Sequence, residues 1–545
     1  MSTRKYVFVT GGVTSSLGKG ICVSSLGALL EGRGYKVSLQ KIDPYLNVDP
    51  GTMSPYEHGE VYVTEDGAEA DLDLGNYERF TTQEVRRVNS MTTGQVYMSV
   101  LEKERRGDYL GKTVQIIPHI TDEIKNRIRA CADESNSDIH VVEVGGTVGD
   151  IESVPYLEAI RQFSRDEGLH NVAYVHLTLA PYLSAADEVK SKPTQHSVKE
   201  LMKSGIHPHV IVCRSNLPLA LDVRMKIALF CDVKEESVIS AYNAPSSVYQ
   251  MPEVFAKEGL DIAVLEALSL PVDTPRNLQK WHDVSAAFRV MNRPIVSIAI
   301  VGKYVGHQDA YKSVYEALIH AGLALRVEIQ LLLIHAEDLE NNDEMSWQII
   351  RAAHGILIPG GFGERGIEGI ISAITHARNE NIPLFGICLG MQCLAIEFAR
   401  SQLGLTDAHS TEFDQQTEHP IVDIMEEQKK QYQLGGTMRL GSFHTKLEEG
   451  SLAHTLYGRK DIQERHRHRY EFNNAYRKQF EDAGMRFSGI NPELNLVEVM
   501  ELPSHKWFLA GQFHPEFKSK PFAAHPLFRG FVEASLAEKL ERKKG

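Results

Sequence analysis

One cysteine of this chain stands in a run that is typical of a nucleophile. Cys388 lies within Gly386–Gly390 (GICLG), after an apolar segment and before a helical pattern. Glycines on both sides permit the sharp turn that lifts a sulfur clear of a sheet, and the N-terminus of the following helix favours thiolate over thiol. The backbone N–H of Leu389 can donate to an oxyanion. The spacing predicts a cysteine nucleophile between a strand and a helix.

Two other segments offer partners for this cysteine. Upstream, the glycine-rich run at 359–363 (PGGFG) follows a predicted strand, and its amides can supply a second oxyanion donor. Downstream, His514 and Glu516 stand two residues apart in QFHPEF, so an extended segment would place both side chains on one face. His514 can then accept the thiol proton while Glu516 orients the imidazole. A buried structural cysteine is the competing interpretation, but the three segments together favour a catalytic triad.

A candidate phosphate-binding loop lies near the other end of the chain. The run Gly11–Gly20 (GGVTSSLGKG) follows a predicted strand and precedes a predicted helix. Inward-turned amides, a helix N-terminus and the Lys19 ammonium together stabilise phosphate oxygens. Two features depart from the standard loop: Gly12 lies one residue too far from the Gly-Lys pair, and Gly20 replaces the Ser or Thr that normally binds magnesium. A glycine-rich turn with an exposed lysine is the competing interpretation.

Because Gly20 has no hydroxyl, a magnesium ion at this loop requires acidic side chains. The segment 65–73 (EDGAEADLD) is dense in carboxylates, and Glu143 is predicted near the C-terminal end of a parallel strand, where α/β sheets bind ligands. An acidic run by itself is more often a solvated surface. A basic run at Lys190–Gln195 (KSKPTQ) suits a polyphosphate, although a surface loop is the alternative interpretation.

The elements that would position these residues alternate between short apolar runs and amphipathic stretches, which is typical of parallel α/β sheets. The segment Pro271–Pro294 breaks this pattern with three prolines and a polar middle. We therefore predict two doubly wound α/β domains, at 1–270 and 295–545, joined by a linker at 271–294. The predicted strands are Tyr6–Thr10, Lys36–Gln40, His140–Val144, Ala173–Leu179, Val210–Arg214, Ile295–Val301, Val327–Leu333, Gly355–Ile358 and Leu384–Ile387, and two predicted helices are Ile21–Arg33 and Val154–Glu167.

Composition narrows the class of protein. The chain of 545 residues is 42% hydrophobic and 24% charged, with six cysteines that form no CxxC pair. It has no apolar run of the ~18 residues that a membrane helix needs and no signal pattern at its N-terminus, so we expect a cytoplasmic protein without a membrane partner. A formal net charge of −14 argues against nonspecific nucleic-acid binding.

Taken together, the motifs resemble those of the CTP synthase family, which joins a P-loop NTPase-like (dethiobiotin-synthetase-like) amidoligase domain to a class I glutamine amidotransferase domain. The resemblance covers nearly the whole chain. It is carried by the stretches VTGGVTSSLGKG, KIDPYLNVDPGTMSPYEHGEV, TEDGAEADLDLGNYERF, KERRGDYLGKTVQIIPHIT, GGTVGDIES, KPTQHSVKEL, PGGFGERG, GICLGMQ, LGGTMRLG, RHRHRYEFNN and QFHPEF.

The resemblance implies a ligase that converts UTP to CTP with ATP and Mg²⁺, using ammonia released from glutamine or supplied free. It implies activation by GTP, inhibition by the product CTP, and a homotetramer that can assemble into filaments. This reaction would be the last step of de novo CTP synthesis.

The resemblance also assigns roles to residues. It implies ATP contacts from Ser16, Leu17, Gly18, Lys19, Gly20, Ile21 and Asp73, with Mg²⁺ on Asp73 and Glu143. It implies UTP or CTP contacts from Ser15, Asp150, Ile151, Glu152, Lys190, Ser191, Lys192, Pro193, Thr194, Gln195 and Lys226, near Gln115 and His119. It implies a glutaminase triad of Cys388, His514 and Glu516 and glutamine contacts from Gly361, Leu389, Gly390, Met391, Gln392, Glu412 and Arg469. Lys41 matches a synthetase-site lysine, and Leu434–Gly441 resembles a lid over the GTP-responsive glutaminase site.

One stretch departs from the family pattern. Relatives carry an acidic pair near Tyr242–Pro245 that contacts adenine, whereas this chain has none there. The resemblance therefore does not carry adenine contacts over to this stretch.

Two other functions remain open from the sequence. An amidotransferase acting on another acceptor, such as a carboxylate activated by ATP, would use the same loop, but Gly145–Ser153 and Lys192–Leu201 favour UTP. A nucleotide-gated switch or filament former with a decayed glutaminase is a hypothesis of another class. The intact Cys388, His514 and Glu516 argue against it.

Overall fold

The computed structural model describes residues 4–185, 187–244, 246–424 and 438–543. The chain forms two compact units, each assembled from two pieces of sequence. The first unit comprises Met1–Thr52 and Asp73–Arg289, and the second comprises Met53–Leu72 and Val290–Gly545. Each unit has its own sheet and its own hydrophobic core.

The described residues of the first unit contain a seven-stranded sheet with strand order β11-β10-β7-β1-β6-β2-β5, and its neighbouring strands pair in parallel. Parallel sheets are covered on both faces, which explains why β1, β6 and β7 are buried almost throughout. The predicted strands of this half are confirmed, although β2 starts one residue later than predicted and runs on to Asp43. The strands are β1 (Lys5–Gly11), β2 (Val37–Asp43), β5 (Ser90–Thr92), β6 (Ile139–Val144), β7 (Val172–Leu179), β10 (Val210–Ser215) and β11 (Val238–Tyr242).

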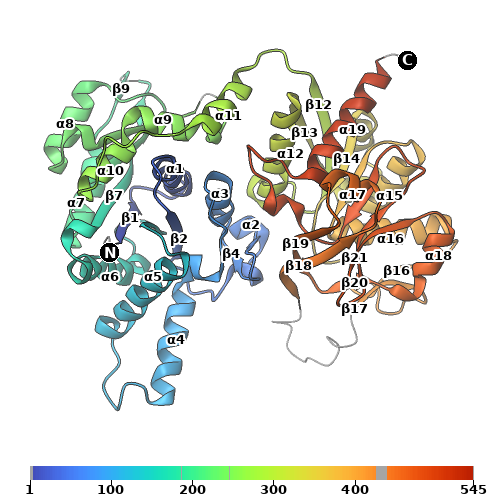
Figure 1. Ribbon diagram of the computed structural model, residues 1–545, viewed down its shortest axis with the longest axis horizontal. Helices are drawn as coiled ribbons and strands as arrows, with labels where there is room; N and C mark the ends of the chain where they lie inside the picture. Colours follow the sequence, from blue (N-terminus) through green and yellow to red (C-terminus); the bar gives the residue numbers. More distant parts are fainter. Residues whose placement is uncertain (1–3, 186, 245, 425–437, 544–545) are drawn as a thin grey trace. The chain divides into compact units, whose positions relative to one another are not determined.

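Helices cover both faces of this sheet (Figure 1). One face packs against α1 (Lys19–Gly32), α3 (Asp73–Phe80), α9 (Met251–Glu258) and α10 (Leu260–Ala267). The other packs against α4 (Thr93–Arg106), α5 (Thr121–Ser135) and α6 (Val154–Glu167), around a core that includes Phe8, Val142 and Phe163. The predicted helix over Val154–Glu167 is confirmed, and α1 begins two residues before the predicted start. The remaining helices of this unit are α7 (Lys192–Lys203), α8 (Leu221–Cys231) and α11 (Gln279–Arg289).

The described residues of the second unit contain a nine-stranded sheet with strand order β13-β12-β14-β15-β23-β22-β21-β18-β19. Five neighbouring strands, β13, β12, β14, β15 and β23, pair in parallel. The other pairings in this sheet are antiparallel. The four strands predicted in this half are confirmed as β12 to β15, with β13 starting one residue late. The strands are β12 (Ile295–Gly302), β13 (Glu328–His335), β14 (Gly355–Ile358), β15 (Leu384–Ile387), β18 (Arg439–Leu447), β19 (Asp461–His468), β21 (Arg486–Asn491), β22 (Leu496–Glu501) and β23 (Phe508–Gly511).

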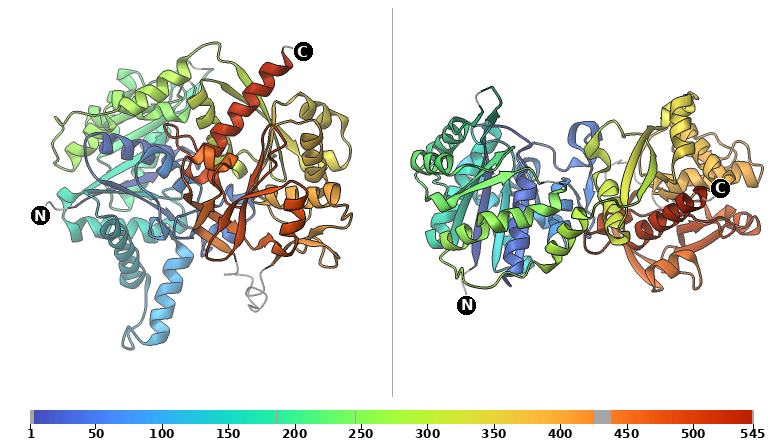
Figure 2. Two further views of the ribbon diagram at one scale, coloured as in Figure 1. Left: turned by 45° about the vertical axis from the view of Figure 1, so that its right-hand side comes forward. Right: turned by 90° about the horizontal axis from the view of Figure 1, so that it is seen from above.

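Two hydrophobic cores flank this second sheet. One includes Ile356 and Leu384 beneath α15 (Ile367–Asn379) and α16 (Leu389–Gln402). The other includes Phe385 and Leu357 beneath α12 (Lys312–Leu325) and α19 (Pro526–Arg542). Figure 2 shows the helices on either side of the strands. Shorter elements are α13 (Ala336–Glu340), α14 (Glu344–Ala352), α17 (Leu452–Tyr457), α18 (Arg477–Asp482) and a small sheet of β16 (His409–Ser410), β17 (Pro420–Ile424) and β20 (Tyr470–Phe472).

The compact units divide the sequence differently from the predicted domains. Helix α11 falls in the predicted linker yet belongs to the first unit, because Trp281 is buried and packs against Phe80. The segment Met53–Leu72 falls in the predicted first domain yet belongs to the second unit. It contains α2 (Pro55–His58) and the hairpin of β3 (Tyr62–Val63) and β4 (Glu69–Ala70).

Among the described residues, no helix combines the length and the apolar character needed to cross a bilayer.

Candidate active sites

The predicted phosphate-binding loop joins β1 to α1. Helix α1 begins at Lys19, and Gly18 before it takes a left-handed conformation with φ of 89°. Ser16 also has a positive φ, of 57°, so the loop is tightly folded. The Lys19 ammonium donates to the carbonyl of Gly146, 2.8 Å away, beyond the end of β6. Burial lowers the pKa of Lys19, against the raising effect of Glu143. The lysine therefore lies where the carboxyl ends of the parallel strands meet.

Lys41 gathers the two predicted metal ligands. Its ammonium lies 2.5 Å from Asp73 Oδ2 and 3.0 Å from Glu143 Oε1, and Tyr77 donates to Glu143 Oε2 at 2.6 Å. Burial would raise the pKa of Asp73, but Lys41 holds it below its usual value. Burial and the neighbouring Asp73 raise the pKa of Glu143. Glu143 lies inside β6, whose last residue is Val144, so this carboxylate is fixed by the sheet itself.

The glycine at position 20 is explained by Asp73. A Cβ added to Gly20 would lie 2.0 Å from Asp73 Oδ1, much closer than any real side chain can approach. A serine or threonine at this position would therefore displace the carboxylate. The space that a hydroxyl side chain fills in a standard loop is here occupied by a carboxylate from α3.

The residues predicted to bind UTP or CTP lie on several elements. Ser191 precedes α7, while Lys192 to Gln195 form its first turn, in which Gln195 donates to the Ser191 hydroxyl at 3.1 Å. Thr194 and Gln195 are buried. Lys190 instead pairs with Glu188. Ser15 is exposed in the loop after β1, Asp150, Ile151 and Glu152 are exposed before α6, and Lys226 is exposed on α8.

Within the described part of the first unit, no hydrogen bond or ion pair joins Lys226 or the Asp150–Glu152 segment to Lys190–Gln195. The structure therefore places the predicted UTP contacts on separate segments, with Ser15, Asp150–Glu152 and Lys226 exposed and Ser191, Thr194 and Gln195 buried. His119 lies in a π-helical turn (Ile116–Ile120), and Gln115 directly precedes this turn. The backbone amide of Gln115 donates to His119 Nδ1 at 3.0 Å.

A cavity of about 530 Å³ opens beside the phosphate-binding loop. Leu17 and Gly18 line one side, and Asn243 and Ala244 line another. Arg214 holds this second side by donating to the carbonyl of Ala241 at 3.2 Å. The stretch for which the resemblance carries no adenine contacts thus borders a cavity next to the loop, and Asn243 and Ala244 line the cavity there.

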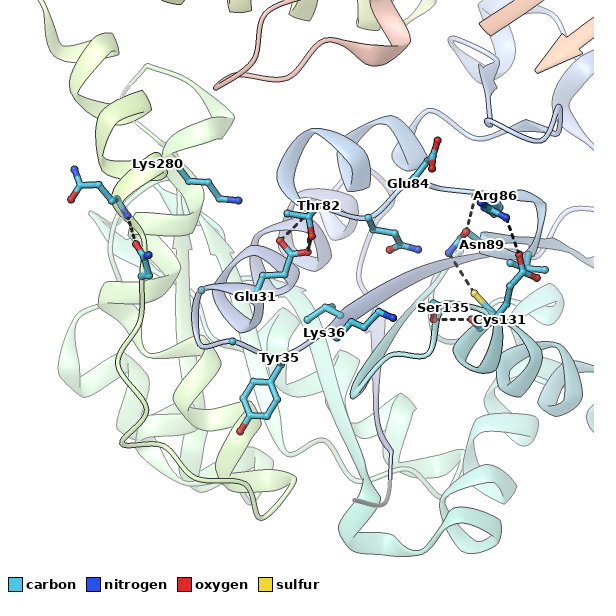
Figure 3. Close-up of a pocket in the computed structure, with 18 residues that line it drawn as sticks. Glu31, Tyr35, Lys36, Thr82, Glu84, Arg86, Asn89, Cys131, Ser135 and Lys280 are labelled. Carbon is cyan, nitrogen blue, oxygen red and sulfur yellow. Dashed lines mark hydrogen bonds and ion pairs between the residues drawn. The ribbon is translucent and has the colours of Figure 1, made fainter. Parts of the chain in front are cut away.

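A larger cavity, of about 930 Å³, lies elsewhere in the first unit (Figure 3). None of the predicted site residues lines it. Some of its polar side chains are paired with one another: Glu31 accepts from the Thr82 amide and hydroxyl, and Asn89 contacts Cys131. We assign no ligand to this cavity.

In the second unit, Cys388 lies at the predicted sharp turn between β15 and α16. Its backbone is strained, with φ of 52° and ψ of −100°, and its amide donates to Gly511 at 2.8 Å. A Cβ on Gly390 would lie 2.4 Å from the carbonyl oxygen of Ile358, so only glycine allows this approach. The thiol lies 3.8 Å from the carbonyl oxygen of Arg467. The turn holds Cys388 at the start of α16, as predicted.

His514 and Glu516 are in direct contact, with Nδ1 and Oε1 2.7 Å apart. The prediction of an extended segment is wrong, because Pro515 starts a short 3₁₀ helix (Pro515–Lys518) directly after His514. The pair meets within this turn instead of by strand alternation. Burial would lower the pKa of His514, but Glu516 and Cys388 raise it to about 10.

The glycine-rich turn before α15 lies against this pair. A Cβ on Gly360 would lie 2.8 Å from His514 Cε1 and 3.6 Å from Cys388 Cβ. Gly360 therefore stands beside both the sulfur-bearing residue and the imidazole. The structure brings together the three segments of the predicted triad, from β14, β15 and the end of β23.

Most residues predicted to contact glutamine lie around this turn. Leu389 to Gln392 form the first turn of α16, and Gln392 donates to the carbonyl of Tyr470 at 3.1 Å. Glu412 accepts from the Gly363 amide at 2.9 Å. Burial raises the pKa of Glu412, although the Gly363 amide and the nearby Arg469 oppose this shift. Gly361 packs against Leu389, since a Cβ there would lie 3.1 Å from it.

Sequence reasoning missed Lys303. This buried lysine directly follows β12 and donates to the carbonyls of Phe362 and Gly363, which pins the glycine-rich turn. Burial lowers its pKa. The only available signal was a lysine at the carboxyl end of a predicted parallel strand. The predicted lid, Leu434–Gly441, lies outside the described residues up to position 437.

Comparisons with known proteins match each half of the chain to a family. Residues 5–270 match the family model described as CTP synthase N-terminus, and residues 307–534 match glutamine amidotransferase class-I. The chain is 56% identical over 535 residues to a CTP synthase of Aquifex aeolicus, covering 98% of this chain and 99% of that protein. It is 54% identical over 542 residues to a CTP synthase of Hydrogenobaculum, covering 99% of both.

Among solved structures, the glutaminase domain of a Trypanosoma brucei CTPS with bound acivicin is 38% identical, with a TM-score of 0.42, over 44% of this chain and 94% of that one. The full-length relatives and both family models lead to one conclusion: the chain belongs to the CTP synthase family, with an N-terminal synthetase domain and a C-terminal class I glutamine amidotransferase domain.

Proposed function

We propose that this protein is a glutamine-hydrolysing CTP synthase, which aminates UTP with ATP as co-substrate. The observation that carries the proposal is the pairing of Cys388, on a strained turn, with the His514–Glu516 pair in a chain that also has the Lys19 loop. A chain with only the first site would be a glutaminase. A chain with only the second would be a nucleotide-dependent ligase without its nitrogen donor.

The glutaminase step follows from the charges around the thiol. His514 accepts the proton of Cys388, and Glu516 stabilises the resulting imidazolium. The sulfur attacks the side-chain amide of glutamine, and His514 protonates the leaving ammonia to give a thioester. Water then releases glutamate from the enzyme. The Leu389 amide, at the start of α16, supports the oxyanion of each tetrahedral intermediate.

The synthetase step uses the charges of the first unit. Lys19 neutralises charge on the transferred phosphoryl group of ATP, which phosphorylates O4 of the uracil ring. Phosphate is then a good leaving group, and ammonia displaces it from C4. The products are CTP, ADP and phosphate. Joining both activities in one protein favours direct use of the released ammonia. Ammonia free in water at neutral pH is mostly ammonium, which has no lone pair for attack.

The residues of the first unit fit a magnesium ion. Asp73 and Glu143 converge on Lys41, and carboxylates with phosphate oxygens are the ligands that Mg²⁺ prefers. When bound there, the ion would offset negative charge on the ATP phosphates. Asp73 takes the position of the missing hydroxyl at Gly20, which supports its role as a ligand.

We also infer an oligomer and regulation by nucleotides. Leu221, Met225 and Leu229 are exposed in a line along α8, which supports burial against further copies of the chain as a homotetramer or filament. The exposed residues of the predicted UTP site, Ser15, Asp150–Glu152 and Lys226, fit a pocket completed in that assembly. Activation by GTP, inhibition by CTP and cytoplasmic residence remain predictions.

Absorbance measurements of UTP conversion to CTP test the proposal, with ATP plus glutamine and then with ATP plus ammonia. We expect both reactions in the wild type, only the ammonia reaction in Cys388→Ala, and neither in Lys19→Ala. Failure of the wild type to form a cytidine nucleotide in either reaction would overturn the proposal. Turnover of a carboxylate acceptor in place of UTP would identify a different amidotransferase.

A further inference from the structure

The β3–β4 hairpin belongs to the second unit although both chain segments that flank Met53–Leu72 belong to the first. Its turn is tight: the Thr64 amide donates to the Ala68 carbonyl at 2.9 Å, and the Gly67 amide donates to the Thr64 carbonyl at 3.1 Å. This turn carries Glu65, a carboxylate for which the sequence suggested only a general acidic surface or metal site.

The turn packs backbone against backbone on β18. The Ser442 amide donates to the Glu65 carbonyl at 3.0 Å. A Cβ on Gly67 would lie 2.6 Å from the Leu440 carbonyl oxygen, and a Cβ on Gly441 would lie 2.6 Å from the Gly67 nitrogen. Both glycines have positive φ, of 79° and 94°. The position of Glu65 is thus fixed by a close approach that other residues would prevent.

The Glu65 carboxylate joins two cations. Its Oε2 lies 2.7 Å from Arg465 Nε, and its Oε1 lies 2.9 Å from Lys518 Nζ. The Arg465 side chain is only 2% exposed and the Glu65 side chain 20% exposed, so this pair is largely shielded from water. Burial would raise the pKa of Glu65, but the Ser442 hydroxyl and the two cations lower it to about 2. The carboxylate is therefore ionised at every pH at which the enzyme would work.

Both cationic residues belong to segments that adjoin the predicted general base. The His514 amide donates to the carbonyl of Arg465 at 2.8 Å, so β19 positions the backbone of the histidine. Lys518 is the last residue of the 3₁₀ helix that carries Glu516. The ring of Phe517, in the same helix, stacks on the His514 imidazole with centroids 5.3 Å apart.

The hairpin holds this 3₁₀ helix at a further point. The Tyr62 hydroxyl donates to the Phe517 carbonyl at 3.1 Å, and the two rings lie 4.9 Å apart. Arg465 also donates to the Tyr62 hydroxyl at 2.9 Å. The contacts of Tyr62 and Glu65 therefore tie β19 to the helix on either side of His514.

We propose that Glu65 is a positioning residue for the glutaminase: by binding Arg465 and Lys518 it fixes His514 and Glu516 relative to the thiol. Glu65 contacts neither the thiol nor the imidazole, and it acts only through these two cations. The inference rests on the proposed glutaminase function. It assigns part of the geometry of that site to a segment that precedes it by hundreds of residues in the chain.

The test is Glu65→Gln in the full-length chain, with glutamate release and CTP formation measured separately. The amide keeps the shape but removes the charge that holds both cations. We expect kcat for glutamine to fall about 10-fold, since small misplacements of reacting groups reduce rates strongly. KM for glutamine and the ammonia-dependent rate should stay within about 2-fold, because the change leaves the substrate contacts and the first unit intact.

A matched control is Glu449→Gln, which removes an exposed carboxylate of the same unit that pairs with Lys460 at 2.6 Å. Its glutamine-dependent kcat should equal that of the wild type. Glu65→Asp keeps the charge and should recover part of the loss. If Glu65→Gln fails to fold, Lys518→Gln removes one of the two cations at a partly exposed position. This variant should likewise lose kcat for glutamine while KM and the ammonia-dependent rate stay nearly unchanged.

A pH profile separates positioning from a merely structural role. The alkaline limb of the pH profile of glutamine-dependent kcat reports loss of the His514 proton, and in Glu65→Gln it should move to lower pH, because a displaced Glu516 raises the pKa of His514 less. An unchanged kcat and profile would overturn the inference, as would equal losses in the glutamine and ammonia reactions. A wild type without glutaminase activity would instead contradict the proposed function.

Discussion

A methyl group at position 20 provides a stringent test of the synthetase site. In Gly20→Ala the new Cβ would lie 2.0 Å from Asp73 Oδ1, so the carboxylate must move by about 1 Å or more to reach an ordinary contact distance. That movement disturbs the 2.5 Å pair with Lys41. A misplacement of this size costs about 10²-fold in rate, which corresponds to about 2.7 kcal/mol in the activation barrier.

The same substitution should not unfold the protein. Alanine is more favourable than glycine inside a helix by roughly 0.5–1 kcal/mol, which offsets part of the local clash. The matched control is Gly27→Ala in the same helix. Its new Cβ would lie 2.9 Å from a Thr81 methyl group, so it would contact an apolar atom and not a carboxylate. We expect Gly20→Ala to lose ammonia-dependent CTP formation while glutamate release persists. Wild-type CTP formation by Gly20→Ala would refute this account of the loop.

Two further changes test the second unit. In Glu516→Gln, burial is no longer opposed by that carboxylate, so the pKa of His514 should fall below about 10. Glutamine-dependent kcat should drop roughly 10²-fold or more, and an unchanged pH profile of kcat would contradict the assignment. Burial raises the pKa of Glu471 to about 8 despite its pairing with Arg439. The folded state therefore holds an extra proton between about pH 4.5 and 8, and stability should fall as the pH rises through that window. Glu471→Gln should flatten this dependence in urea unfolding at several pH values, and an unaltered slope would exclude Glu471 as its source.

Local sequence patterns predicted the phosphate-binding loop and the cysteine turn well. The phosphate-binding loop and the cysteine turn are each encoded within about ten residues, because a strand, a glycine-dependent turn and a helix start follow one another directly. For the same reason most strands were predicted within a residue or two. The turn at Pro515 was predicted incorrectly, since His-x-Glu spacing suits both a strand and a 3₁₀ helix.

Contacts between distant segments could not be predicted in this way. The space at Gly20 is filled by Asp73, and the turn at 359–363 is pinned by Lys303, and neither relation leaves a periodic or spacing signal. The hairpin of Glu65 was grouped with the first domain because it is surrounded by that domain in sequence. Only packing shows that its partners lie in the second unit.

The membership of Met53–Leu72 in the second unit has a consequence for biosynthesis. Glu65 and Arg465 are 400 residues apart, so a ribosome that adds 5–20 residues per second would leave the hairpin without its partner for roughly 20–80 seconds. An excised glutaminase fragment that begins at Val290 would lack the hairpin altogether, so co-expression of Met53–Leu72 should improve the yield of such a fragment.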